Sequence, residues 1–283
     1  MLEIKLEDLF LDEKVQIKVS QVRTEHKELF DLIKKFNHLF VRIVESFINQ
    51  KVPNRINYIY TMFSQMHYSY QAYILLLERG LYDDSQIILR SLCDKAIKIL
   101  YVLNKKENYY LLGQDIINKK IKKLSNLDGT EMIKIIGEDR INKEIEELKK
   151  YQKDPKVSLP TIKQICDQID MKDLYIQYSI LSDYTHENLN VLMENNVVLD
   201  EGIIIGKGFR YEDFYNDVSM SISFFEIVLS KMNSLLDLEE YVVDFEKIKR
   251  KLDLLCKKKE DKRFANNWIL YFWYIRYNKT KRN

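Results

Sequence analysis

The chain has 283 residues, 46% of them hydrophobic, with only 7 Gly and 3 Pro and a net charge of +2. So few turn-forming residues argue against a fold of many short strands, each of which needs its own turn, and favour helices joined by short polar loops. The apolar runs are only a few residues long, too short to span a membrane, and the N-terminus lacks the basic and apolar regions of a secretory signal.

Along most of the chain, apolar residues recur at steps of three and four, which is the spacing of one buried stripe on a helix. In the first such segment the stripe runs from Leu29 through Phe40 to Phe47. Pro53 suits the first turn of the next helix, and Gly80 suits its C-terminal end. The pattern predicts helices over residues 29–47, 53–79, 83–103, 161–169, 172–194 and 213–236.

Two other segments have different patterns. Residues 105–153 are rich in both charges, as in KKIKK and EIEELKK, which is typical of helices with solvated faces. We expect breaks in this helical segment around Asp128-Gly129 and at Gly137. Further on, VVLD and IIIG flank a Glu201-Gly202 turn, which indicates a short hairpin. We therefore predict an all-α multi-helix bundle of about seven to nine helices, with one small β-hairpin near residues 196–206.

The three cysteines, Cys93, Cys166 and Cys256, lie far apart in the sequence. They indicate reduced thiols rather than a disulfide framework or a zinc site. Asp183-x-x-His186 resembles half of a di-iron motif but has no second copy in the sequence, and the sequence contains no phosphate-binding glycine loop. We therefore expect a cytoplasmic protein with no cofactor, no metal ion and no membrane partner.

Charge divides the chain at about residue 244. Residues 245–283 carry 13 Lys/Arg and 4 Asp/Glu, a net charge of +9, which leaves −7 on residues 1–244. We interpret residues 1–244 as the helical bundle body and residues 245–283 as a basic, aromatic C-terminal helical tail. Its last predicted helix, residues 264–278, is aromatic on nearly every face, so we expect it to bind a second copy of the chain or a partner protein. Packing within the fold and RNA binding stay open as alternatives.

The first candidate for chemistry is a pair of charged residues. Arg90 and Asp94 lie four residues apart in the helix predicted over residues 83–103, so their side chains meet on one face beside the apolar stripe. An Arg at the edge of a core needs a partner, and Asp94 can provide one. The pair is interpreted either as a structural ion pair that fixes the helix register, or as an Arg held rigid and aimed at a phosphate or carboxylate.

The second candidate is a polar strip. Tyr178, Ser182 and His186 follow at steps of four in YIQYSILSDYTHENLN, so they line one side of the helix predicted over residues 172–194. A lone His on such a strip is more often a hydrogen-bonded core residue than a catalyst, but the phenol, hydroxyl and imidazole together suit chemistry as well. His67, on the apolar line of the helix after Pro53, is interpreted as a core residue that can bond to this strip.

The two motifs resemble those of a bacterial family of helical proteins, domain of unknown function 5677. Members of that family carry Arg-x-x-x-Glu on one helix and Tyr-x-x-x-Ser-x-x-x-His on a later one. The matching residues here are Arg90, Asp94, Tyr178, Ser182 and His186. Asp94 stands where the family usually has Glu, which shortens the reach of the carboxylate. The resemblance covers roughly residues 50–240.

The resemblance implies a distant relation to the higher eukaryote and prokaryote nucleotide-binding (HEPN) helical domains. Many of those domains are ribonucleases of toxin–antitoxin and phage-defence systems, with Arg and His four to six residues apart on one helix. This sequence lacks that spacing, so Arg90 and His186 would have to meet from two helices. The expected function is a component of a bacterial conflict or antiviral-defence system that acts through a polar pocket, with metal-independent RNA cleavage as the candidate reaction. His186 would be the general acid or base, and Arg90 would stabilise the phosphate.

A function of another class stays open beside it. The chain is then a non-catalytic binding or assembly module, whose polar strip is structural and whose basic, aromatic tail docks a partner. A geometric condition applies to the site in either case. If the two motifs form one site, Arg90 or Asp94 lies within hydrogen-bond or single-water reach of Tyr178, Ser182 or His186.

Overall fold

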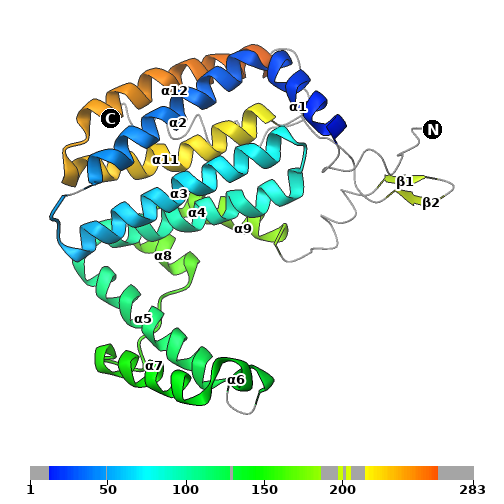
Figure 1. Cartoon of the computed structure of the whole chain (residues 1–283). Helices are drawn as coiled ribbons and strands as arrows, with labels where there is room; N and C mark the ends of the chain where they lie inside the picture. The colour runs from blue at the N-terminus through cyan, green and yellow to red at the C-terminus, as the bar shows by residue number, and fades with distance from the viewer. Residues whose placement is uncertain are drawn as a thin grey trace. The chain divides into compact units, whose positions relative to one another are not determined.

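The computed structural model describes residues 13–48, 50–127, 130–185, 197–199, 202–204 and 214–260 (Figure 1). The helices of this part are α1 (Glu13–Glu25), α2 (Lys27–Phe47), α3 (Asn54–Glu78), α4 (Tyr82–Asn104), α5 (Lys106–Ser125), α6 (Glu131–Ile136), α7 (Glu138–Tyr151), α8 (Ile162–Gln168), α9 (Lys172–Asp183), α11 (Phe214–Leu236) and α12 (Glu239–Glu260).

The all-α class is therefore confirmed, but the predicted number of helices is too low. Eleven helices lie in the described part of the chain. The charged segment 105–153 contributes three of them, because α6 and α7 are separated at Gly137, whose φ of +91° does not fit a helix. Two three-residue strands, β1 (Val197–Leu199) and β2 (Gly202–Ile204), pair antiparallel with Val197 opposite Ile204. In the described residues no helix is long and apolar enough to cross a bilayer.

The chain divides into two compact units. Unit 1 comprises residues 1–99 and 172–283, and unit 2 comprises residues 100–171. The compositional boundary at residue 244 lies inside α12, which runs as one helix from Glu239 to Glu260 and buries Phe245 and Leu252. The basic segment up to residue 260 is thus part of the core of unit 1. The predicted helix over residues 264–278 lies outside the described residues.

Aromatic side chains form the core of unit 1. The predicted stripe of α2 is confirmed, since Leu29, Phe40 and Phe47 are all buried. In Figure 1, α2 lies alongside α12, with α11 and then α3 below it. The Phe40 ring stacks on Phe225 of α11 with centroids 4.0 Å apart, and Phe245 of α12 lies 5.3 Å from Phe36. Rings of α3 meet the same cluster, as Phe63 does Phe225 at 5.6 Å, so burial of rings from four helices stabilises this unit.

Two buried phenols in this core, Tyr70 and Tyr73, have no hydrogen-bond partner among the described residues. Tyr70 is 1% exposed, and burial raises the pKa of its hydroxyl, so the group stays neutral. A buried hydroxyl without a partner costs desolvation free energy, so we expect Tyr70→Phe to raise the free energy of unfolding by about 1 kcal/mol. Urea denaturation measures this. In the matched control Tyr60→Phe, the lost hydroxyl does have a partner, the Gln50 side chain at 3.2 Å, so stability should fall. A loss of stability in Tyr70→Phe would contradict this account.

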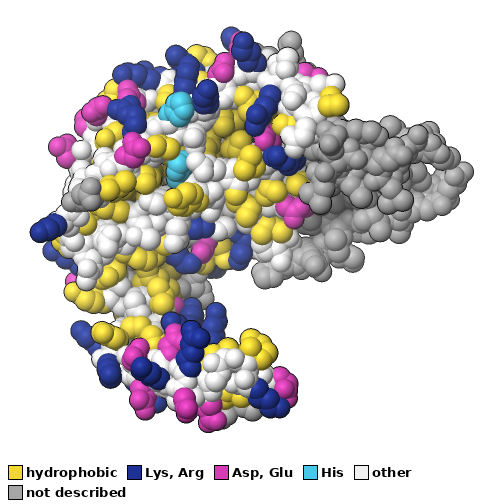
Figure 2. All heavy atoms as spheres, in the orientation of Figure 1, with side chains coloured by type: hydrophobic (Ala, Val, Ile, Leu, Met, Phe, Trp, Pro, Cys, Tyr) yellow, Lys and Arg dark blue, Asp and Glu magenta, His cyan; other side chains and the backbone are white. Residues whose placement is uncertain are grey.

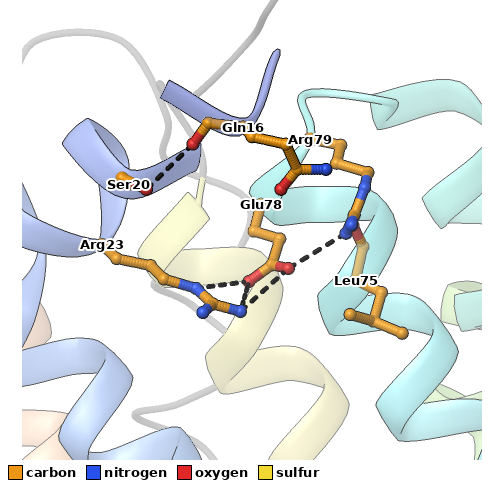
Figure 3. Close-up of polar contacts among 6 residues, drawn as sticks. All are labelled: Gln16, Ser20, Arg23, Leu75, Glu78 and Arg79. Atoms are coloured by element: carbon orange, nitrogen blue, oxygen red, sulfur yellow. Dashed lines mark hydrogen bonds and ion pairs between the residues drawn. The ribbon is translucent and has the colours of Figure 1, made fainter. Parts of the chain in front are cut away.

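A buried carboxylate joins α1 to the end of α3 (Figure 3). Glu78, only 2% exposed, accepts hydrogen bonds from Arg23 Nε at 3.0 Å and Arg23 NH2 at 2.8 Å, and from Arg79 NH1 at 3.0 Å. Figure 3 shows the two guanidinium groups approaching the carboxylate from two different elements. The helix ends here as predicted, because Gly80 takes a φ of +73° and Leu81 N–H bonds to the Leu76 carbonyl.

This cluster supplies a stability prediction. Arg23→Ala removes the hydrogen bonds that Arg23 donates to a carboxylate held away from water, so we expect it to lower the free energy of unfolding by about 1–3 kcal/mol. Arg42→Ala is the control, because Arg42 pairs with Glu240 and Asp244 at the surface, where ion pairs contribute little. Thermal or urea denaturation compares the two variants. Equal losses in both would contradict a special role for the buried carboxylate.

Unit 2 is held together by α5 and the loop after α7. Gln114 accepts from the backbone N–H of Lys153 at 2.7 Å, and Asn118 donates to the carbonyl oxygens of Asp154 and Val157. The remaining charged side chains are largely solvated or paired with each other, as Lys120 is with Glu144 at 2.6 Å. Figure 2 shows acidic and basic side chains interspersed on this unit, as the alternating charges of its sequence predict.

Candidate functional site

Burial of the apolar stripes fixes where the candidate residues of α4 and α9 lie. α4 buries Leu89 and Cys93 completely, which places Arg90 at the edge of the core. α9 buries Leu174 and Leu181, so Tyr178 and Ser182 lie beside that apolar line. The Cys93 thiol donates to the Leu174 carbonyl oxygen at 3.9 Å, which holds the first turn of α9 against α4.

Arg90 is held by two hydroxyl groups of α9. Its Nε donates to Ser182 Oγ at 3.0 Å and its NH2 donates to Tyr178 Oη at 2.8 Å. The guanidinium carbon also lies 4.9 Å from the centre of the Tyr178 ring, within the range of a cation–π contact. Ser182 donates its own hydroxyl hydrogen to the Tyr178 carbonyl at 2.7 Å, which leaves its lone pairs for Arg90. The predicted proximity of the two motifs is confirmed for these three residues.

Asp94 does not pair with Arg90, so the predicted ion pair is wrong. Its carboxylate accepts instead from Lys98 Nζ at 2.5 Å. Side chains on a helix lean toward its N-terminus, so Lys98 leans back over Asp94 while Arg90 leans away from it. The same geometry makes an acid four residues before a base the better order. Asp94 therefore belongs to a half-exposed ion pair next to the site.

The electrostatics of Arg90 follow from these contacts. In the part of the chain that the structure describes, its partners are neutral hydroxyls and no carboxylate forms an ion pair with it. Among the described residues, two of its five N–H donors are used, and no carboxylate offsets its positive charge. A half-buried guanidinium oriented in this way suits a phosphate or carboxylate ligand, because its remaining donors match the oxygens of such a group.

His186 lies outside the described residues, so its position relative to Arg90 stays a prediction. α9 ends at Asp183, and residues 186–194 of the helix predicted to residue 194 lie outside the described residues. Thr185 closes the last turn, since its N–H and Oγ1 both donate to the Ser182 carbonyl at 3.0 and 2.7 Å. His186 follows this turn directly in the chain.

His67 is a core residue, as predicted, but in the described residues its hydrogen bonds go to Asn37 and Gln71 and not to Tyr178 or Ser182. Its Nε2 lies 2.8 Å from the Asn37 side-chain oxygen, and Gln71 bonds to the same oxygen at 2.9 Å. Burial lowers the pKa of His67, which keeps the ring neutral. Among the described residues, no group of three or more His, Cys, Asp or Glu side chains is arranged to hold a metal ion.

A comparison with protein families assigns the chain. The model of a family of unknown function, DUF5677, matches residues 56–204, more than half of the sequence. The chain belongs to this family. The DUF5677 match is shorter than the resemblance over residues 50–240, yet it includes every candidate residue from Arg90 to His186. Comparisons with curated proteins and with solved structures found no match.

Sequence reasoning missed one cation within the DUF5677 region. Lys95 of α4 is half-buried, and its Nζ donates to Ser91 Oγ at 2.6 Å and to Ser69 Oγ at 3.0 Å. The signal in the sequence was a Ser four residues before a Lys on the flank of an apolar helix. Local spacing could have suggested the Ser91 contact, but not the contact with Ser69 of another helix.

Proposed function

We propose that this DUF5677 protein binds RNA phosphates at Arg90 and cleaves RNA without a metal ion, as a component of a bacterial conflict or antiviral-defence system. The observation that supports the proposal is the set of contacts that Arg90 makes. Its charge has no carboxylate partner in the described residues, and two hydroxyls of α9 orient it. We also propose that the chain is distantly related to the HEPN ribonucleases.

The proposed reaction assigns one role to each group. His186 removes the proton from a ribose 2′-OH, and the 2′-oxygen attacks the adjacent phosphorus. The bond from phosphorus to the 5′-oxygen breaks, which leaves a 2′,3′-cyclic phosphate, and the 5′-oxygen takes up a proton from water. Arg90 stabilises the negative charge that accumulates on the phosphate oxygens in the transition state. Tyr178 and Ser182 are positioning residues, because they hold the guanidinium.

The test is a cleavage assay on 5′-labelled RNA in the presence of EDTA. The unmodified protein is expected to release products with 2′,3′-cyclic phosphate ends, and His186→Ala is expected to abolish release while it leaves the melting temperature nearly unchanged. His26→Ala is a control outside the proposed site, because His26 packs against Phe214 and Tyr215. If the unmodified protein cleaves no RNA, or if His186→Ala cleaves at the unmodified rate, the proposed reaction fails.

A non-catalytic binding or assembly module is the alternative, and one observation favours it. Arg90 joins α4 to α9 through two hydrogen bonds, as a structural clip between helices does. In that case the C-terminal tail would dock a second copy of the chain or a partner protein. Truncation tests this, but the cut has to follow residue 260, because α12 buries Phe245 and Leu252 in unit 1. Loss of an oligomer or a partner on removal of residues 261–283 would support the assembly function.

A further inference from the structure

A second cation lies on the other flank of α4. Lys95 Nζ contacts three oxygens, Ser91 Oγ at 2.6 Å, Ser69 Oγ at 3.0 Å and the Ser91 carbonyl at 3.5 Å. Within the described ranges of the chain, no carboxylate forms an ion pair with it. Burial lowers the pKa of the Lys95 ammonium, and the nearby charge of Asp94 opposes that shift only in part.

Another buried lysine of unit 1 has its positive charge offset by carboxylates of the chain. Lys249 of α12 is also largely buried, but its Nζ pairs with Glu226 at 3.3 Å and with Asp253 at 3.2 Å. These two carboxylates keep the pKa of Lys249 raised despite its burial. Lys95 has hydroxyls in place of carboxylates, and neutral hydroxyls do not offset the cost of removing an ammonium from water. An anionic ligand would offset that cost.

Lys95 and Arg90 are placed so that one extended ligand can reach both. They lie five residues apart, about 7.5 Å along the helix axis and about 140° around it. The ridge of α4 between them carries Ile87, 42% exposed, and the Asp94–Lys98 ion pair, whose charges cancel. The two flanking cations therefore lie on either side of a ridge with no net charge.

We infer that Lys95, Ser69 and Ser91 form a second phosphate-binding subsite, and that the ligand is a single-stranded RNA whose backbone crosses α4 from Arg90 to Lys95. The inference rests on the proposed function and names its substrate class. The three side chains offer an ammonium and two hydroxyls to the oxygens of one phosphate. Tyr68 precedes Ser69 on α3 and is 69% exposed, so it offers a ring on which a base can stack.

The test measures binding of fluorescent twelve-nucleotide oligo(U) and oligo(A) RNA by the full chain carrying His186→Ala, which prevents cleavage. In this background, we expect Lys95→Gln to weaken the binding of both RNAs several-fold and to the same extent. The slope of log K, the logarithm of the association constant, against log salt concentration should fall by about 0.7. Its melting temperature should be unchanged or higher, because a half-buried ammonium is removed. Lys34→Gln is the charge-matched control, since Lys34 is exposed on α2, and it should leave the slope unchanged.

The outcomes separate the inference from the proposed function. If Arg90→Ala weakens RNA binding but Lys95→Gln behaves like Lys34→Gln, the second subsite is wrong and the Arg90 site stands. If Arg90→Ala leaves RNA affinity unchanged, or if the His186→Ala protein binds no RNA, the proposed function fails and the subsite with it. A Lys95→Gln protein that melts earlier and binds RNA with the original salt slope would show that Lys95 is structural.

Discussion

Replacing Phe225 with alanine is expected to lower the free energy of unfolding by about 3–5 kcal/mol, the largest loss of stability that we predict for a single substitution. The Phe225 ring is fully buried and stacks on Phe40 at 4.0 Å. It also meets Phe63 edge-on at 5.6 Å and Tyr70 at 5.7 Å. Alanine would leave a cavity among three rings from two other helices, α2 and α3, and these rings cannot collapse into it without moving their backbones.

Urea denaturation of both proteins measures this loss. Leu235→Ala is the control on the same helix, because Leu235 is 51% exposed and its truncation should change stability by less than about 0.5 kcal/mol. If Phe225→Ala unfolds at nearly the urea concentration of Leu235→Ala, the arrangement of α2, α3 and α11 around this ring is wrong.

Arg90→Ala is expected to reduce RNA cleavage by about 100- to 1,000-fold, because it removes the group proposed to stabilise the transition-state charge. Arg90→Lys should recover little of the loss, since an ammonium cannot reproduce the planar fork that Tyr178 and Ser182 hold. Initial rates under single-turnover conditions measure both variants. Tyr178→Phe keeps the ring and removes one hydrogen bond to Arg90, so its cleavage rate should lie between those of the unmodified protein and Arg90→Ala.

Stability serves as the control for this prediction. Asp94 keeps its bond to Lys98 when Arg90 is removed, so no carboxylate of the described residues loses its partner. We therefore expect Arg90→Ala to unfold only slightly earlier than the unmodified protein. Arg42→Ala removes a guanidinium that two carboxylates already neutralise, and it should cleave RNA at the unmodified rate. An Arg90→Ala protein that cleaves normally would contradict the role of Arg90, and one that fails to fold would favour the structural alternative.

Most of the helices of unit 1 were predictable because each buries one apolar face. The stripe of α2 and the glycine end of α3 follow from local rules, and the structure confirms both. The break at Gly137 was predicted from its glycine, but α1 (Glu13–Glu25) was not, because its largely polar and charged sequence offers only a short apolar stripe, Val19 and Val22. Division into two units also depends on contacts between segments far apart in the chain, which periodicity does not contain.

The candidate site was predictable in part. Spacing alone placed Tyr178 and Ser182 on one side of a helix, and their contact with Arg90 followed from the resemblance to DUF5677. The ion pair predicted for Arg90 is wrong because helical side chains lean toward the N-terminus, which brings Lys98 rather than Arg90 to Asp94. Lys95 was missed because its second hydroxyl partner, Ser69, comes from another helix.

The most direct test of the central claim is a crystal structure of the His186→Ala protein with a short single-stranded RNA. The account predicts a phosphate oxygen within hydrogen-bond distance of the Arg90 guanidinium, with Tyr178 and Ser182 still bonded to its other nitrogens. RNA bound elsewhere on the protein, or an Arg90 whose donors are all occupied by carboxylates of the chain, would contradict it.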